Sequence, residues 1–143
     1  MKLRKAEFND WPLLLAWRND EETRKNSLNT EPVSETAHKQ WLEKILQDGH
    51  RRLFIALEQD EPAGTVRADY DPEHNRFELS WTVAPHARGK GLGKKMVKLL
   101  ADSIQGKVMA RVKTGNISSV KIAESAGLVF EKEENGFLFF LRK

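Results

Sequence analysis

The order of apolar patterns along the chain predicts an α/β or α+β domain, with one mixed β-sheet and helices against its faces. Two observations support this prediction. Segments with strand-like and helix-like spacing follow one another as β, α, α, three strands, α, β, α and two strands, which gives seven strands in all. The 143 residues contain no repeat, low-complexity tract or linker, and this length is common for one domain. We therefore expect a single domain over residues 1–143.

The N-terminal third is predicted to form one strand, Leu3–Phe8, and two helices. The first helix begins after Asp10 and the second after Ser34, because both residue types are good N-caps. Residues 23–33 are polar and contain a proline, so they predict a loop or a short helical piece. The apolar stripes of the two helices are Trp11, Leu13, Leu14 and Trp17, and Trp41, Leu42, Ile45 and Leu46.

The middle of the chain is predicted to form three consecutive strands, residues 52–58, 63–70 and 76–83. Turn-forming residues separate them, including Pro62 and the run from Asp71 to Asn75. The third strand alternates between apolar and polar residues, which predicts one buried face. That face consists of Phe77, Leu79, Trp81 and Val83.

The last third is predicted to alternate between helices and strands. A helical pattern runs from Met96 to Ile104, and a strand follows at residues 108–112. A further helix opens at Thr114-Gly115-Asn116 and ends at Gly127, a suitable left-handed cap residue. The final hairpin pairs residues 128–133 with 137–141 around Asn135-Gly136, a strong turn signal.

The overall composition excludes several classes of function. A formal net charge of +3 is too small to indicate nucleic acid as the main partner. No segment approaches the roughly 18 apolar residues of a membrane-spanning helix, and Met1–Lys5 lacks the apolar stretch of a secretory signal. The absence of cysteine excludes disulfides, thiolate metal sites and a Cys nucleophile, and is compatible with a reducing cytosol. We therefore expect a cytoplasmic protein without nucleic-acid or membrane contacts.

The segment Arg88–Lys94, with the sequence RGKGLGK, is the most informative part of the chain. Three glycines alternate with basic residues where a strand pattern gives way to a helical one. Glycine lets the backbone approach a ligand closely, and the first turn of a helix presents unpaired N–H groups and positive potential. Arg88, Lys90 and Lys94 add full charges. The segment predicts a pyrophosphate-binding loop, and the alternative is a flexible basic surface loop.

Two other phosphate-binding motifs do not fit this segment. A Walker A loop requires Gly-Lys followed by Ser or Thr, whereas Gly93-Lys94 is followed by Lys95 and Arg88 occupies the position of the first glycine. A dinucleotide-binding fingerprint needs a glycine at position 94, which is Lys. The remaining pattern is R-x-x-G-x-G, formed by Arg88, Gly91 and Gly93.

With the strand before it, this loop resembles the acetyl-CoA segment of the GNAT superfamily of N-acetyltransferases. The strand Phe77–Val83 is followed by Ala84-Pro85 and then by the glycine loop. A second motif, Asn116-x-x-Ser119 followed by Glu124-x-x-Gly127-Leu128, extends the resemblance over essentially the full chain. Two motifs in the right order and on the right elements are more specific than either alone. The branch that looks most similar contains ribosomal-protein-alanine and amino-sugar-nucleotide N-acetyltransferases.

The resemblance implies a fold, a co-substrate and a set of coenzyme contacts. The fold is a mostly antiparallel sheet of about seven strands, with helices on both faces, that splays open between strands 4 and 5, often beside a bulge. The co-substrate is acetyl-CoA, and no metal is involved. Strand backbone pairs with the pantetheine arm, loop amides hold the pyrophosphate, and the second helix contacts pantetheine or phosphates, although Asn116 could be a plain helix cap. The residues implicated are Trp81, Thr82, Val83, Arg88, Gly89, Lys90, Gly91, Leu92, Gly93, Lys94, Asn116 and Ser119.

The mechanism implied by the resemblance is direct transfer, EC 2.3.1.-. A neutral amine attacks the thioester, an amide N–H near Val83 stabilises the oxyanion, and coenzyme A leaves as a thiolate. Many members carry a Tyr seven residues after the motif Asn as general acid, but that position is Ala123 here. Because a thiol has a pKa of about 8.5, the thiolate needs little help near neutral pH. Ser119 and water are the preferred donors, ahead of Ser125.

Glu78 is the preferred candidate for the general base. It lies on the strand that lines the acceptor cleft in the family, where a carboxylate can take a proton directly or through water. The alternative is an exposed strand carboxylate paired with Arg67 or Arg76. Ser80 and Asp69 are lesser candidates.

The N-terminal helices are expected to select the acceptor. Arg18, Arg24 and His38 resemble the pattern of the amino-sugar-nucleotide branch and could bind the diphosphate of a 4-amino-sugar nucleotide. Arg18 could instead be the cationic end of a helix, and His38 an exposed or capping histidine. Three tryptophans fall on apolar stripes and are expected in the core: Trp11, Trp17 and Trp41.

Three functions stay open at this point. The preferred one is acetyl-CoA-dependent transfer to a primary amine of a small molecule, with a 4-amino-sugar nucleotide as one candidate acceptor and an open basic groove as its expected site. A protein N-terminal acetyltransferase of the ribosomal-protein-alanine type should instead have a narrow acidic slot. A non-catalytic acyl-CoA-binding module is the third. We expect a monomer or a homodimer.

Overall fold

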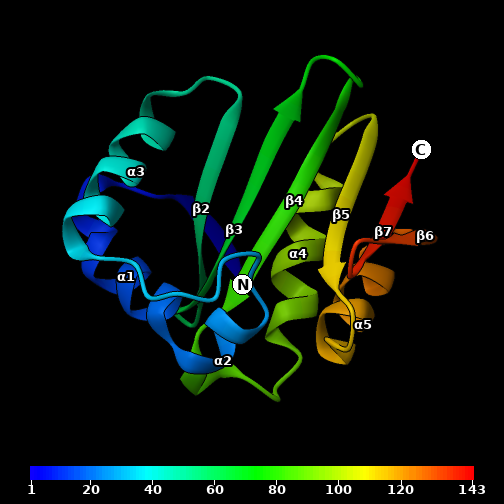
Figure 1. Ribbon diagram of the computed structural model, residues 1–143. Coiled ribbons are helices and arrows are strands. Elements are labelled where there is room, and N and C mark those ends of the chain that lie inside the picture. The colour runs from blue at the N-terminus through cyan, green and yellow to red at the C-terminus, as the bar shows by residue number, and fades with distance from the viewer.

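Seven strands form one open sheet with the order β1-β2-β3-β4-β5-β7-β6 (Figure 1). The computed structural model describes residues 1–143. All neighbouring strands are antiparallel except β4 and β5, which are parallel. The predicted mixed, mostly antiparallel sheet is therefore confirmed. The strands are β1 (Lys2–Lys5), β2 (Arg51–Glu58), β3 (Glu61–Asp71), β4 (Arg76–Val83), β5 (Lys107–Lys113), β6 (Val129–Glu134) and β7 (Phe137–Arg142).

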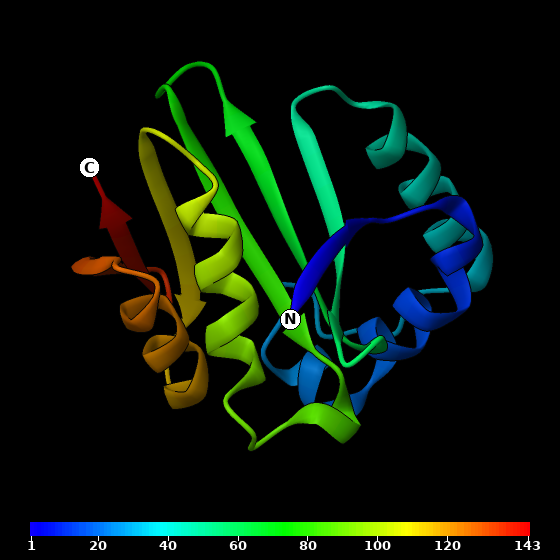
Figure 2. The same ribbon diagram turned by 180° about the vertical axis from the view of Figure 1, so that it is seen from behind.

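Helices cover both faces of the sheet (Figures 1 and 2). One face carries η1 (Phe8–Asp10), α1 (Trp11–Asn19), α2 (Glu21–Lys25) and α3 (Glu35–Gln47), and the other carries α4 (Leu92–Asp102) and α5 (Ile117–Ser125), with η2 (Pro85–Ala87) before α4. None of the helices has the length and apolar character needed to cross a bilayer. Because strand side chains alternate between faces, the core divides into two clusters. Leu79, Met96 and Phe140 belong to the cluster under α4 and α5, and Trp17, Leu42 and Ile55 to the other.

Local signals placed most element boundaries correctly. Ser34 caps α3, since its Oγ accepts a hydrogen bond from the N–H of Ala37 at 3.1 Å. The Asn135-Gly136 turn has φ values of 52° and 82°, as the hairpin signal requires. Residues 23–33 contribute to a short helix, α2, and then continue as a loop. The predicted first strand is too long, because Phe8–Asp10 turns into η1 and Asp10 accepts a hydrogen bond from the N–H of Glu7.

The sheet splays open between β4 and β5. The two strands pair only from Arg76 with Lys107 to Leu79 with Ala110. Beyond that point β4 continues through residues 80–83, while β5 continues through residues 111–113 and stays paired with β7. The register between β3 and β4 shows no shift, so no bulge accompanies the splay there. The edge of residues 80–83 that faces β5 is consequently left without a strand partner.

Candidate functional site

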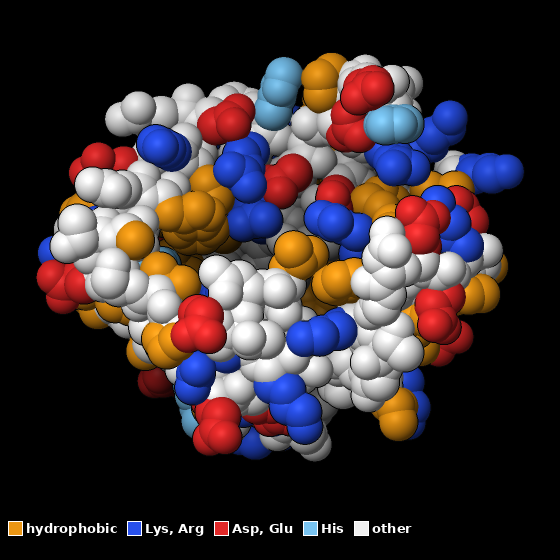
Figure 3. All heavy atoms as spheres, in the orientation of Figure 1, with side chains coloured by type: hydrophobic (Ala, Val, Ile, Leu, Met, Phe, Trp, Pro, Cys, Tyr) orange, Lys and Arg blue, Asp and Glu red, His pale blue; other side chains and the backbone are white.

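A cleft with a volume of about 1500 Å³ opens where β4 and β5 separate. Figure 3 shows it as a hollow in the middle of one face, with Lys and Arg side chains around it. One half is lined by the end of β4, the glycine loop and the start of α5, and we call it the coenzyme half because these are the residues predicted to bind the coenzyme. The other half is lined by α1, α3 and the polar faces of β3, β4 and β5, and we call it the acceptor half after the predicted acceptor-binding residues. The two halves meet at residues 78–83 of β4, so ligands bound in the two halves would meet there.

The three glycines of the loop serve two different structural purposes. Gly89 and Gly91 have φ values of 76° and 75°, in the left-handed region that favours glycine, and a Cβ on either would meet nothing within 4 Å. Gly93 lies in the first turn of α4, where a Cβ would come within 2.6 Å of Ile122 Cδ1 and 2.9 Å of Val83 Cγ2. The first two glycines therefore shape an open turn, and the third lets α4 pack closely against α5 and β4.

The N-terminus of α4 points its backbone donors into the coenzyme half. Gly91 is the N-cap and supplies no side-chain acceptor, so no side chain satisfies the N–H groups of the first turn. The helix dipole adds positive potential at the same place. Lys94 lines the cleft beside these donors, whereas Lys90 is exposed and lies outside the cleft wall. This combination can hold a diphosphate through backbone N–H groups and one ammonium group.

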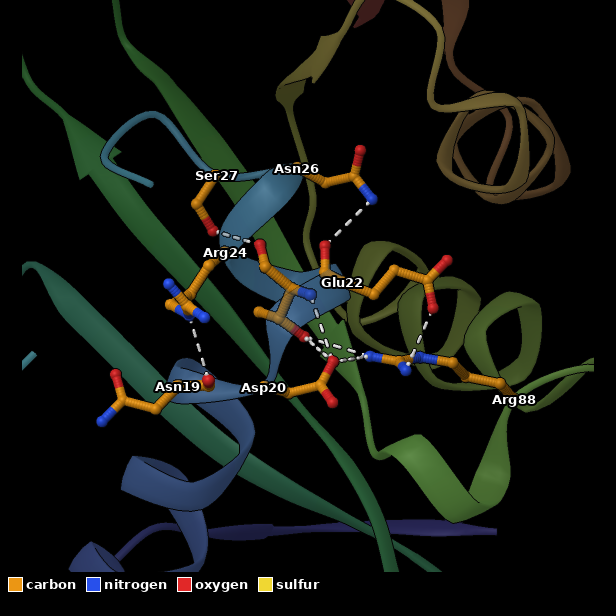
Figure 4. Close-up of polar contacts among 8 residues, drawn as sticks. Asn19, Asp20, Glu22, Arg24, Asn26, Ser27 and Arg88 are labelled. Atoms are coloured by element: carbon orange, nitrogen blue, oxygen red, sulfur yellow. Dashed lines mark hydrogen bonds and ion pairs between the residues drawn. The ribbon is translucent and has the colours of Figure 1, made fainter. Parts of the chain in front are cut away.

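Arg88 differs from the other cations of the loop. Its guanidinium is paired with Asp20 and Glu22 at the start of α2 (Figure 4). The hydrogen bond from Arg88 lowers the pKa of the Asp20 carboxyl below its ordinary value. The backbone of Arg88 remains part of the loop, but its positive charge is compensated and is not a free contribution to phosphate binding.

The second motif forms a small hydrogen-bond network at the wall of the cleft. Asn116 caps α5, because its Oδ1 accepts a hydrogen bond from the N–H of Ser119 at 3.2 Å. Ser119 Oγ in turn accepts hydrogen bonds from Asn116 Nδ2 at 3.1 Å and from Trp81 Nε1 at 3.2 Å. A hydroxyl has two lone pairs and one proton, so this Ser119 hydroxyl is left as a donor. The position usually held by Tyr, Ala123, is fully buried, and Ser125 does not line the cleft.

Glu78 lies in the acceptor half and is already paired. Its Oε2 accepts a hydrogen bond from Arg111 Nε at 2.8 Å, so the partner is on β5 rather than being Arg67 or Arg76. Arg67 instead pairs with Asp69 at 3.0 Å. Ser80 also lines the cleft, whereas Asp69 does not.

The structure brings together two of the three predicted acceptor-binding residues. Arg18 and His38 both line the cleft, and Arg18 Nη1 and His38 Nε2 are buried without a hydrogen-bond partner. Arg24 does not line the cleft. It donates to the carbonyls of Asn19 at 3.1 Å and Thr30 at 3.3 Å, and so holds the loop that follows α2.

His38 is a buried histidine rather than an exposed one. Only 3% of it is accessible, and its ring stacks on Trp41 with 5.4 Å between centroids. Burial lowers the pKa of His38, and the charge of Arg18 lowers it further, so the ring is neutral at neutral pH. Trp17 is buried in the core as predicted. Trp11 and Trp41 pack against the same core cluster but stay partly exposed, and Trp41 also contributes to the cleft wall.

Cations outnumber carboxylates in the lining of the cleft, and three of the cations, Arg67, Arg88 and Arg111, are themselves in ion pairs. Seven Lys and Arg residues line it against two carboxylates, Glu22 and Glu78, and both carboxylates are in ion pairs with arginine. The cations are Arg18, Arg67, Arg88, Lys94, Arg111, Lys113 and Lys121. Neither Arg111 nor Lys113 was predicted as a site residue, although their alternation with the buried Val108, Ala110 and Val112 shows that they share the opposite face of β5.

Comparisons with known proteins agree with this geometry. A family model described as an acetyltransferase (GNAT) domain matches residues 1–129. No curated protein sequence matches the chain.

Several solved structures have the same fold. A spermidine N-acetyltransferase from Vibrio cholerae, in complex with CoA and spermine, has a TM-score of 0.85 and 21% identity over 99% of this chain and 94% of that chain. A ribosomal-protein-alanine N-acetyltransferase from Brucella melitensis has a TM-score of 0.80 and 26% identity over 99% of each chain. An aminoglycoside acetyltransferase, AAC(6')-Ib, in complex with coenzyme A and kanamycin, has a TM-score of 0.85 and 18% identity over 99% and 94%.

Proposed function

Because the chain belongs to the GNAT family of acetyltransferases, we propose that it moves the acetyl group of acetyl-CoA directly to the primary amine of a small molecule that also carries a phosphate or diphosphate. A 4-amino-sugar nucleotide is the acceptor class to test first. The observation that supports the coenzyme part most strongly is the uncapped N-terminus of α4 beside the unpaired edge of β4. A diphosphate and an extended pantetheine arm need these two features side by side.

The proposed mechanism assigns the proton transfer to Glu78 and the stabilisation of the departing sulfur to Ser119. The amine nitrogen attacks the thioester carbonyl while an amide near Val83 stabilises the oxyanion, and the carbon–sulfur bond then breaks. Glu78 takes the proton that the amine loses, directly or through a water molecule. Coenzyme A leaves as a thiolate, and the Ser119 hydroxyl donates a hydrogen bond to the departing sulfur, since Trp81 and Asn116 already donate to its oxygen.

The charge of the acceptor half supports an anionic acceptor. Polyamines and aminoglycosides are polycations, and binding them favourably requires carboxylates that are free of other partners. Both carboxylates that line this cleft are neutralised by Arg88 and Arg111. Arg18 offers one buried donor without a partner, which suits a phosphate oxygen.

A protein N-terminal acceptor is the second candidate, and the 26% identity to a ribosomal-protein-alanine N-acetyltransferase favours it. Such an acceptor presents an ammonium end, for which a narrow acidic slot is expected. A wide basic cleft argues against this candidate. A cytoplasmic location, a monomeric or homodimeric state and the absence of nucleic-acid partners stay predictions.

A thiol-release assay with acetyl-CoA and a panel of amines tests this proposal. The panel contains amino-sugar nucleotides, the same amino sugars without phosphate, spermidine, amino acids and peptides with N-terminal alanine. We expect release with the amino-sugar nucleotides and much less with their phosphate-free counterparts. Preference for spermidine or for peptides would refute the anionic-acceptor proposal. Binding of acetyl-CoA with no release for any amine would favour a non-catalytic acyl-CoA-binding module.

A further inference from the structure

We propose that Arg88 is a positioning residue for the amine acceptor, because it latches the roof of the acceptor half to the coenzyme-binding loop. The roof is defined as residues 20–33, which comprise α2 and the loop after it. The proposal rests on the acetyl-transfer function proposed above. The roof residues that line the cleft are Glu22, Thr23, Asn26, Ser27, Leu28, Asn29 and Val33.

The guanidinium of Arg88 lies against the N-terminal end of α2 rather than over its own loop (Figure 4). Its Nη2 donates to Asp20 Oδ2 and, at 3.1 Å, to Thr23 Oγ1, while Nη1 lies 3.1 Å from Glu22 Oε2. Asp20 Oδ2 also accepts the N–H of Thr23 at 3.2 Å, so the same carboxylate caps α2. Two carboxylates surround one guanidinium, and a diphosphate placed beside them would be repelled. The side chain of Arg88 therefore binds the start of α2 and is not available to a diphosphate.

Polar contacts, and not apolar packing, hold the roof in place. α2 has no buried residue, and 71% of Leu28 is exposed. Lys113 of β5 holds the other end of α2, because its Nζ donates to the carbonyls of Lys25 at 2.8 Å and Ser27 at 3.3 Å. The α2 part of the roof thus lies across the β4–β5 separation between two cations, one from the coenzyme loop and one from β5. The loop after α2 is held by α1, because Arg18 Nη2 donates to the carbonyl of Asn29 at 2.9 Å. The side-chain amide of Asn19 exchanges two hydrogen bonds of 2.8 Å with the backbone of Val33. Because α2 has no buried residue, the position of α2 depends on its contacts with Arg88 and Lys113.

Arg88 consequently belongs to both halves of the site. Its backbone precedes Gly89 and is part of the loop that faces the coenzyme, and its side chain holds residues 68 positions away in the sequence. Removing the side chain leaves Asp20 and Glu22 without their partner and frees the roof over the acceptor. The expected consequence is weaker acceptor binding with almost unchanged coenzyme binding. If Arg88 instead bound the coenzyme phosphates, its removal would weaken coenzyme binding and leave acceptor binding almost unchanged.

Steady-state kinetics and calorimetry on the full chain separate these two roles. The variants are Arg88→Ala, Arg88→Lys, Asp20→Asn and the double variant Arg88→Ala with Asp20→Asn. We expect Arg88→Ala to raise the KM for the amine at least about tenfold, since a charge-assisted contact is lost, and to leave the Kd for coenzyme A within about threefold. Arg88→Lys should restore part of the loss. The double variant should be no worse than Arg88→Ala, because both changes remove the same contact.

Lys94→Ala is the matched control, because Lys94 lines the coenzyme half and makes no hydrogen bond or ion pair with the roof. It should raise the Kd for coenzyme A and leave the amine KM unchanged. The proposal is overturned if Arg88→Ala behaves like Lys94→Ala. Thermal unfolding of each variant confirms that it is folded, and Asp20→Asn carries the test if Arg88→Ala is not.

Hydrogen exchange provides a readout that needs no acceptor. Amides of residues 21–29 should exchange faster in Arg88→Ala than in the parent chain, while amides of the central strands keep their protection. Unchanged exchange in residues 21–29 would refute the latch, whatever the kinetics show. A parent chain that acetylates no amine would instead refute the proposed function, so the two failures are distinguishable.

Discussion

Replacement of Gly93 by Ala adds only one methyl group, yet it should disturb the packing at the start of α4. The added Cβ would lie 2.6 Å from Ile122 Cδ1 and 2.9 Å from Val83 Cγ2, whereas ordinary contacts begin near 3.4 Å. Both neighbours pack in or against the core cluster under α4 and α5, so either these side chains or α4 must shift. Overpacking of this kind costs about 2–3 kcal/mol, and the better helix propensity of Ala returns about 1 kcal/mol. We expect a net loss of about 1–2 kcal/mol in the free energy of unfolding, together with weaker coenzyme binding.

Urea unfolding followed by tryptophan fluorescence measures the loss of stability. Gly49→Ala is the matched control, because Gly49 has no neighbour within 4 Å and no left-handed φ, so its change should stay within about 0.5 kcal/mol. Ile122→Val removes the nearest clashing atom. In the Gly93→Ala background, Ile122→Val should therefore lower the free energy of unfolding by less than it does in the parent chain, and the two losses should differ by at least about 0.5 kcal/mol. Additive costs, or a Gly93→Ala variant as stable as the parent, would refute the close-packing explanation.

Three further predictions concern catalysis, pH and the core. Glu78→Gln should lower turnover at least about tenfold and spare acetyl-CoA affinity; full turnover in the thiol-release assay would remove Glu78 from the mechanism. Burial holds the pKa of His38 below its ordinary 6.5. As pH falls, the imidazole therefore becomes protonated in the unfolded chain before it does in the folded chain, and the free energy of unfolding decreases below about pH 6.5. In His38→Gln, the free energy of unfolding measured with urea should depend less on pH below about 6.5. An unchanged pH dependence would contradict this role of His38. Phe140→Ala should lower the free energy of unfolding by about 3–5 kcal/mol in the same assay, because Phe140 is buried in the core. Phe130→Ala, on the exposed β6, should lower it by less than about 1 kcal/mol, and equal losses would contradict the assignment of Phe140 to the core.

Features that depend on neighbouring residues were predicted well from the sequence. The bounds of β4 follow from the alternation of Phe77, Leu79, Trp81 and Val83, and the Asn135-Gly136 turn from its backbone preferences. The glycine loop was likewise recognisable, because left-handed turns and an uncapped helix start impose local requirements on residue type.

Features that depend on tertiary contacts could not be predicted from the sequence. The pairing of Arg88 with Asp20 requires the position of α2, which no local pattern specifies. The side chain of Arg24 caps loop carbonyls instead of facing a ligand, and helical spacing alone does not distinguish these outcomes. His38 occurs in a polar stretch of sequence, yet stacking on Trp41 and burial against the neighbouring helix remove it from water.

The central claim is that the N-terminus of α4 and the free edge of β4 bind the diphosphate and pantetheine arm of a coenzyme. Calorimetric titration with coenzyme A, and in parallel with pantetheine that lacks the diphosphate, tests it directly. We predict saturable binding of coenzyme A at one site that weakens as salt is added, and much weaker binding of pantetheine. No detectable binding of coenzyme A, or equal affinity for both compounds, would contradict the claim.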